Sequence, residues 1–117
     1  MIEGDRKFLT VRIMPYFGVN RLVVKDHPSK AKWPDIWMSW EKGVPVIYVT
    51  AEWKRQSKDE RRKRLVHEVA HAVGVEHGRK SGGLMYSTCP AKDTWSMAVY
   101  RDILSGSAGF GGRKFGI

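Results

Sequence analysis

Hydrophobic and polar residues alternate in two short stretches near the start of the chain. In residues 8–14, Leu9, Val11 and Ile13 are separated by the polar residues Thr10 and Arg12. A period of two residues is typical of a strand with one face in solvent. The pattern therefore predicts a strand over residues 8–14 and a second one over residues 21–25.

A hairpin is expected further along the chain. Two apolar segments, residues 36–40 and 44–50, flank the turn sequence Glu41-Lys42-Gly43. The run Val46-Ile47-Tyr48-Val49 has no polar interruption, which is typical of a strand that is buried on both faces. We therefore expect residues 44–50 to form the central strand of a sheet.

Helical patterns dominate the second half. Ser57 followed by Glu60 is a capping-box pattern, so a helix is expected to begin at Ser57 and to end at Gly74. Its apolar stripe consists of Leu65, Val66, Val69, Ala70 and Val73. A last helix is expected over residues 93–104. Together these elements predict an α+β fold: a small twisted sheet, mixed or antiparallel, backed by the helix that starts at Ser57, with a C-terminal helix.

Length and composition limit the organisation of the chain. Its 117 residues fit one domain, which we place at residues 1–105, followed by a flexible glycine-rich tail at residues 106–117. The chain shows no apolar run of about 20 residues and no apolar signal segment at its start, so we expect a cytoplasmic monomer without a membrane anchor. The single cysteine, Cys89, cannot form an internal disulfide.

The chain is strongly basic. Its 21 Lys and Arg residues outnumber 12 Asp and Glu residues, a net charge of +9 that keeps nucleic acid open as a partner. Seven of the cations fall within residues 54–64, and we interpret that run as a solvated helix face. The remaining histidine outside the cluster described next, His27, is expected to be exposed and without a role.

Three histidines lie within eleven residues, in His67-Glu68-Val69-Ala70-His71-Ala72-Val73-Gly74-Val75-Glu76-His77. On a helix, His67 and His71 lie on one face and can bind one ion, and a turn at Gly74 can bring His77 to the same place. Three histidine nitrogens leave the fourth position of a tetrahedral Zn²⁺ open, as in catalytic sites. Glu68 is then the candidate general base that activates zinc-bound water.

This segment resembles the extended zinc motif HExxHxxGxxH of the metzincin clan of metallopeptidases. Gly83-Leu84-Met85-Tyr86 follows at a distance similar to the methionine turn of the matrixin branch, with Ser87 in place of that turn's proline. The resemblance implies a zinc-dependent endopeptidase that acts on peptide or protein substrates. It implies one catalytic Zn²⁺ held by His67, His71 and His77, Glu68 as base, and Met85 beneath the metal. Tyr86 is expected to line the substrate pocket.

Two other functions remain open at this point. Zinc ribonucleases of the rRNA-maturation type share the spacing HxxxHxxGxxH, but generally carry glycine where this chain has Glu68. The chain could instead be a non-catalytic zinc-binding module in which Cys89 supplies a fourth ligand. In an enzyme, the Cys89 thiolate could act as a latch on the open zinc position.

Overall fold

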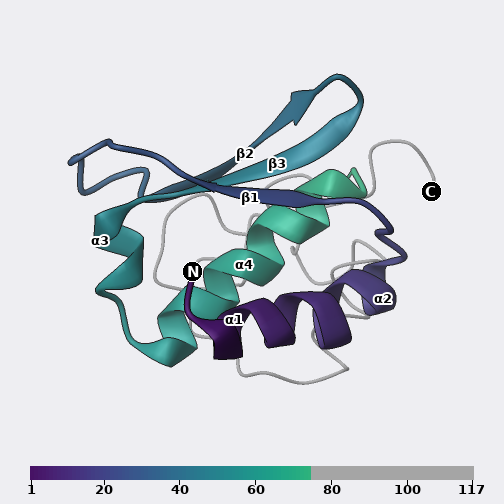
Figure 1. Cartoon of the computed structure of the whole chain (residues 1–117), viewed down its shortest axis with the longest axis horizontal. Coiled ribbons are helices and arrows are strands. Elements are labelled where there is room, and N and C mark those ends of the chain that lie inside the picture. Colours follow the sequence, from purple (N-terminus) through teal and green to yellow (C-terminus); the bar gives the residue numbers. More distant parts are fainter. Residues whose placement is uncertain (75–117) are drawn as a thin grey trace, which may run out of the picture.

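A computed structural model of the chain describes residues 1–74 (Figure 1). The helix predicted at residues 93–104 and the tail at residues 106–117 lie outside this part, as does the end of the domain at residue 105. In chain order the elements are α1 (Glu3–Lys7), the π-helical η1 (Phe8–Ile13), α2 (Met14–Phe17), β1 (Val23–Asp26), β2 (Ile36–Glu41), β3 (Val44–Val49), α3 (Ala51–Lys54) and α4 (Lys58–Ala72).

The sheet has three strands in the order β1-β3-β2. β1 runs parallel to β3 and β2 runs antiparallel to it, so the sheet is mixed and the predicted α+β class is confirmed. The hairpin and the central position of β3 are also confirmed. Lys42 and Gly43 form the turn with positive φ angles of 52° and 76°, a conformation that suits the twist of a two-residue hairpin.

The strand predicted over residues 8–14 is wrong, because this segment is helical. Leu9, Ile13 and Phe17 are four residues apart and all are buried, whereas Val11 between them is 65% exposed. These three side chains form one helix face that packs against the core. A strand would have placed Val11 on the same buried face as Leu9 and Ile13, whereas the four-residue period of the helix leaves Val11 in solvent.

The start and end of α4 follow the prediction. The hydroxyl of Ser57 accepts a hydrogen bond of 3.2 Å from the backbone N–H of Glu60, which caps the helix. Gly74, with φ of 88°, follows the last helical turn. A short helix that we did not predict, α3, begins at Ala51 and is capped by Thr50, whose hydroxyl accepts a hydrogen bond from the backbone N–H of Trp53.

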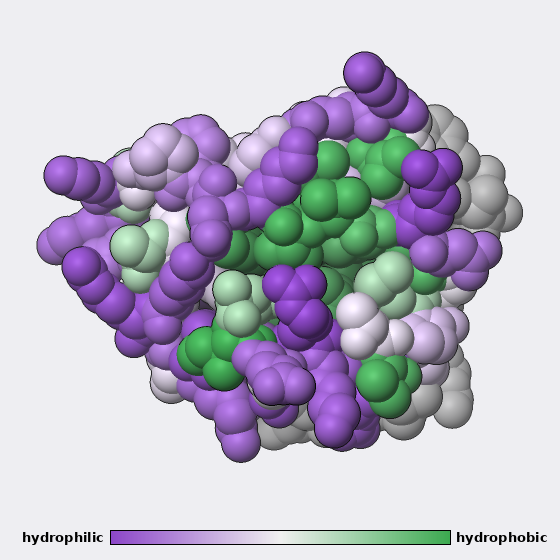
Figure 2. Space-filling view, viewed as in Figure 1, coloured by the Kyte–Doolittle hydropathy of each residue, from purple (hydrophilic) through white to green (hydrophobic). Residues whose placement is uncertain are grey.

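Sheet and helices form two layers around a single core. Figure 1 shows α4 and the N-terminal segment α1–η1–α2 on the same side of the sheet. Their apolar faces meet Ile36, Ile47 and Val49 of the sheet, and Trp53 is fully buried. Figure 2 shows apolar residues gathered over the edge strand β1, where Val23 is 42% exposed. No helix within residues 1–74 is long and apolar enough to cross a membrane.

Candidate metal centre

Helix α4 carries two of the three predicted ligands and the predicted base. With 3.6 residues per turn, the positions of Arg64, His67, Glu68 and His71 fall within an arc of about 100°. The apolar stripe of α4, which enters the core, is centred on the opposite side of the helix. Packing of the apolar stripe in the core thus fixes how α4 is rotated about its own axis. These four polar side chains consequently lie together on the other face of the helix.

His67 and His71 approach each other closely. Their ring centroids are 4.6 Å apart and the rings are nearly perpendicular, at 83°. The two Nε2 atoms are 3.0 Å apart. Two ligands on a tetrahedral zinc, with bonds of about 2.0–2.1 Å, would be about 3.4 Å apart. The pair therefore fits a shared Zn²⁺ after a change of a few tenths of an ångström.

Glu68 lies between these ligands in the sequence and is 8% exposed. Burial, and secondly the charge of Asp35, raise the pKa of Glu68 to about 8. A cation bound by the adjacent imidazoles would favour the charged carboxylate instead. No ion pair or hydrogen bond holds this carboxyl group among the residues that the structure describes, so it is available to a water molecule or a substrate.

A buried ion pair lies on the same face of α4, and no local sequence pattern predicts it. Nη1 of Arg64 donates to Oδ1 of Asp35 over 2.8 Å, and the two residues are 8% and 1% exposed. Thr50 also holds Asp35 in place. The backbone carbonyl of Asp35 accepts one hydrogen bond from the Thr50 hydroxyl at 2.7 Å and a second from the Thr50 backbone N–H at 3.1 Å. Burial raises the pKa of Asp35 although the Arg64 charge opposes the shift.

Comparison of the chain with known proteins identifies no relative: no family model, curated protein or solved structure matches the chain. The function is therefore inferred from the residues and their arrangement.

Several predicted site residues fall outside the described part of the chain. These are the third predicted ligand, His77, and the residues Met85, Tyr86 and Cys89. Within residues 1–74, no group of three or more His, Cys, Asp or Glu side chains comes together to hold a metal. The structure thus brings the rings of His67 and His71 together and places Glu68 on the same face of α4, and the rest of the zinc site stays a prediction.

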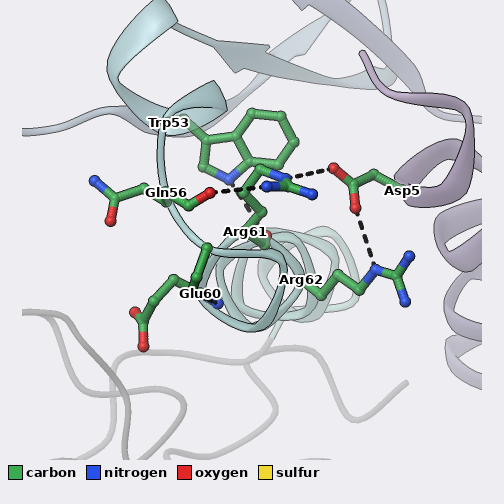
Figure 3. A network of polar contacts seen from close by, with 7 residues as sticks. Asp5, Trp53, Gln56, Glu60, Arg61 and Arg62 are labelled. Carbon is green, nitrogen blue, oxygen red and sulfur yellow. Dashed lines mark hydrogen bonds and ion pairs between the residues drawn. The ribbon is translucent and has the colours of Figure 1, made fainter.

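The interpretation of the basic run as a solvated face is wrong for its second half. Asp5 of α1 is 1% exposed and accepts from Nε of Arg61 at 2.7 Å and from Nε of Arg62 at 3.1 Å (Figure 3). Arg61 also donates to the backbone carbonyl of Gln56 at 2.8 Å. Together with the Arg64–Asp35 pair, these contacts hold three arginines of α4 against carboxylates of the protein itself. They act as structural cations.

The prediction that His27 is exposed is also wrong. Its ring is half-buried and packs edge-to-face on Trp37 and Tyr48, with centroid distances of 4.7 and 5.7 Å. Its Nδ1 accepts the backbone N–H of Ser29 at 3.1 Å. Trp37 and Tyr48 are cross-strand partners on β2 and β3. His27 thus has a packing role in this aromatic cluster.

Proposed function

We propose that this protein is a zinc-dependent endopeptidase in which His67, His71 and His77 hold one Zn²⁺ and Glu68 acts as general base. The observation that carries the proposal is the 3.0 Å approach of the two Nε2 atoms on α4, with the Glu68 carboxyl group on the same helix face and held by no ion pair or hydrogen bond within residues 1–74. A structural zinc site would not need a carboxylate next to a ligand.

Each side chain then has a defined task. Zinc, when bound, polarises the scissile carbonyl and makes water nucleophilic at neutral pH. The carboxylate of Glu68 accepts the proton that the attacking water loses and passes it to the leaving amine. The imidazoles must be neutral to bind the metal, so metal binding is lost in acid.

The position of β2 favours an extended peptide as the substrate. Within residues 1–74, β2 pairs with β3 along one edge and with no other strand along its second edge. A peptide can add to such an edge through backbone hydrogen bonds. The methionine turn with Met85 and Tyr86 is proposed to complete the substrate cleft.

Metal analysis and a protease assay on unfolded protein, with and without a chelator, test this proposal. We expect about one zinc per chain and hydrolysis that the chelator abolishes. His71→Ala should lose the metal, whereas His27→Ala, in the aromatic cluster, should retain it. Glu68→Gln should keep the metal and lose at least ~100-fold in kcat, and Glu3→Gln is its exposed control. An active Glu68→Gln variant would remove Glu68 from the mechanism.

Cleavage of RNA by the parent protein would instead favour the ribonuclease function. The structure offers no specific support for that function from Arg61, Arg62 and Arg64, because all three contact carboxylates of the protein. Zinc binding without hydrolysis of either polymer would favour the non-catalytic module.

A further inference from the structure

Three carboxylates lie near Arg64. It is paired with Asp35 at 2.8 Å, and Glu60 and Glu68 precede and follow it by four residues on α4. Residues four apart on a helix are neighbours, with Cβ atoms about 5–6 Å apart, so an Arg at this position can form an ion pair with either Glu. In the structure Arg64 forms its ion pair with Asp35 and none with Glu68.

We propose that Asp35 is a positioning residue that holds the Arg64 guanidinium away from the Glu68 carboxylate and so keeps the general base free. This inference rests on the proposed peptidase function. A Glu68 carboxylate in an ion pair with Arg64 would have part of its lone pairs occupied by N–H donors and would be turned away from the attacking water, so it would be a poorer general base.

Three contacts hold this arrangement in place. The two hydrogen bonds from Thr50 to the carbonyl of Asp35 fix residue 35 just before β2. On its other side, Arg64 lies over the ring of Trp33, with its Cζ 5.4 Å from the ring centroid. Nε of Arg64 is buried and has no hydrogen-bond partner within residues 1–74, so it can donate to another acceptor. Without the Asp35 charge, the guanidinium has two carboxylates at a distance of four residues on α4, Glu60 and Glu68, and we expect it to turn to Glu68.

The test begins with Asp35→Asn, which keeps the size of the side chain and removes its charge. We expect kcat of the zinc-loaded, folded protein to fall at least ~10-fold, a part of the ~100-fold or larger contribution of a general base, while KM changes little. In the Asp35→Asn background, Arg64→Met removes the competing cation and should restore most of kcat. Arg64→Lys keeps the cation and should leave kcat low.

Comparing Arg64→Met with Arg64→Lys in the Asp35→Asn background distinguishes a positioning role of Asp35 from a purely structural one. Asp5→Asn is the matched control, because it also breaks a buried Asp–Arg contact of α4, at the distant Arg61 and Arg62. Asp5→Asn should lower stability and leave kcat per folded molecule unchanged. The proposal would be overturned if Arg64→Met and Arg64→Lys gave the same kcat in the Asp35→Asn background. A low kcat in Asp5→Asn would also overturn it. If Asp35→Asn does not fold, Asp35→Glu, which keeps the charge, must retain most of kcat.

A crystal structure of Asp35→Asn gives a result that does not depend on activity. We expect the Arg64 guanidinium within hydrogen-bond distance of the Glu68 carboxylate. A guanidinium that stays beside residue 35, or that turns to Glu60, would refute the inference even if the parent proves to be an active peptidase. A parent that hydrolyses no peptide refutes the proposed function, and the position of Arg64 in the variant still decides whether Asp35 holds it away from Glu68.

Discussion

The contact between Asp5 and two arginines of α4 should be a major source of stability, and Asp5→Asn tests it. Asp5 is 1% exposed, and Arg61 and Arg62 are 12% and 23% exposed. Removing one partner of a buried ion pair typically costs about 3–5 kcal/mol, because the other charge stays buried without compensation. Here both arginines can partly return to water and Arg61 keeps its bond to Gln56, so we expect about 2–3 kcal/mol.

Urea unfolding followed by tryptophan fluorescence measures this loss. Trp53 is a suitable reporter, because it is fully buried and its Nε1 donates to the carbonyl of Arg61 at 3.3 Å. For a chain of this size the loss corresponds to a fall in Tm of roughly 10 °C. Chelator should be present in all samples, so that bound metal does not change the comparison.

Asp26→Asn is the matched control. Asp26 pairs with Lys54 at 2.6 Å, but its side chain is 68% exposed, and pairs of this kind contribute about 0–1 kcal/mol. The reasoning is refuted if Asp5→Asn and Asp26→Asn have the same free energy of unfolding. A triple variant with Leu at residue 5 and Met at residues 61 and 62 should recover most of the stability, because apolar side chains can replace a buried ion pair.

Three further outcomes are expected. Ser57→Ala should cost about 1 kcal/mol in chemical denaturation, because it removes the cap on the N–H of Glu60. Gly43→Ala, at φ of 76°, should lower the free energy of unfolding by about 1 kcal/mol in the same assay, because a Cβ disfavours positive φ. Lys54 lowers the pKa of Asp26, so this pair stabilises the fold above pH 3.8 and the gain is lost as pH falls through the lowered pKa. NMR titration of the Asp26 carboxyl in Lys54→Gln should show its pKa rising.

Elements fixed by local patterns were predictable from the sequence. The turn at Lys42 and Gly43 needs residues that tolerate positive φ, and the cap at Ser57 depends on residues only three apart. The spacing of His67 and His71 likewise placed both imidazoles on one helix face. In each case the interaction that decides the structure lies within a few residues of the signal.

Other features depend on residues far apart in the sequence, and no local pattern shows them. The burial of Arg61 depends on Asp5, 56 residues earlier. The pair of Arg64 with Asp35 joins α4 to the residue before β2, and an isolated aspartate after Trp33-Pro34 does not reveal its partner. The helix over residues 8–17 also depends on tertiary packing, because the alternation of Leu9 and Ile13 with polar residues fits a strand when read alone.

These long-range ion pairs have a consequence for the order of folding. Removing a cation from water without a compensating charge costs several kcal/mol. Arg61 and Arg64 are therefore not desolvated before their carboxylate partners are in place. The partners are 56 and 29 residues away along the chain. Such contacts form slowly, because closing a long loop costs entropy before the contact returns any energy. His67 and His71 are only one helical turn apart and meet as soon as α4 forms, but the buried surroundings of this helix face are complete only after the N-terminal segment and the loop before β2 have docked.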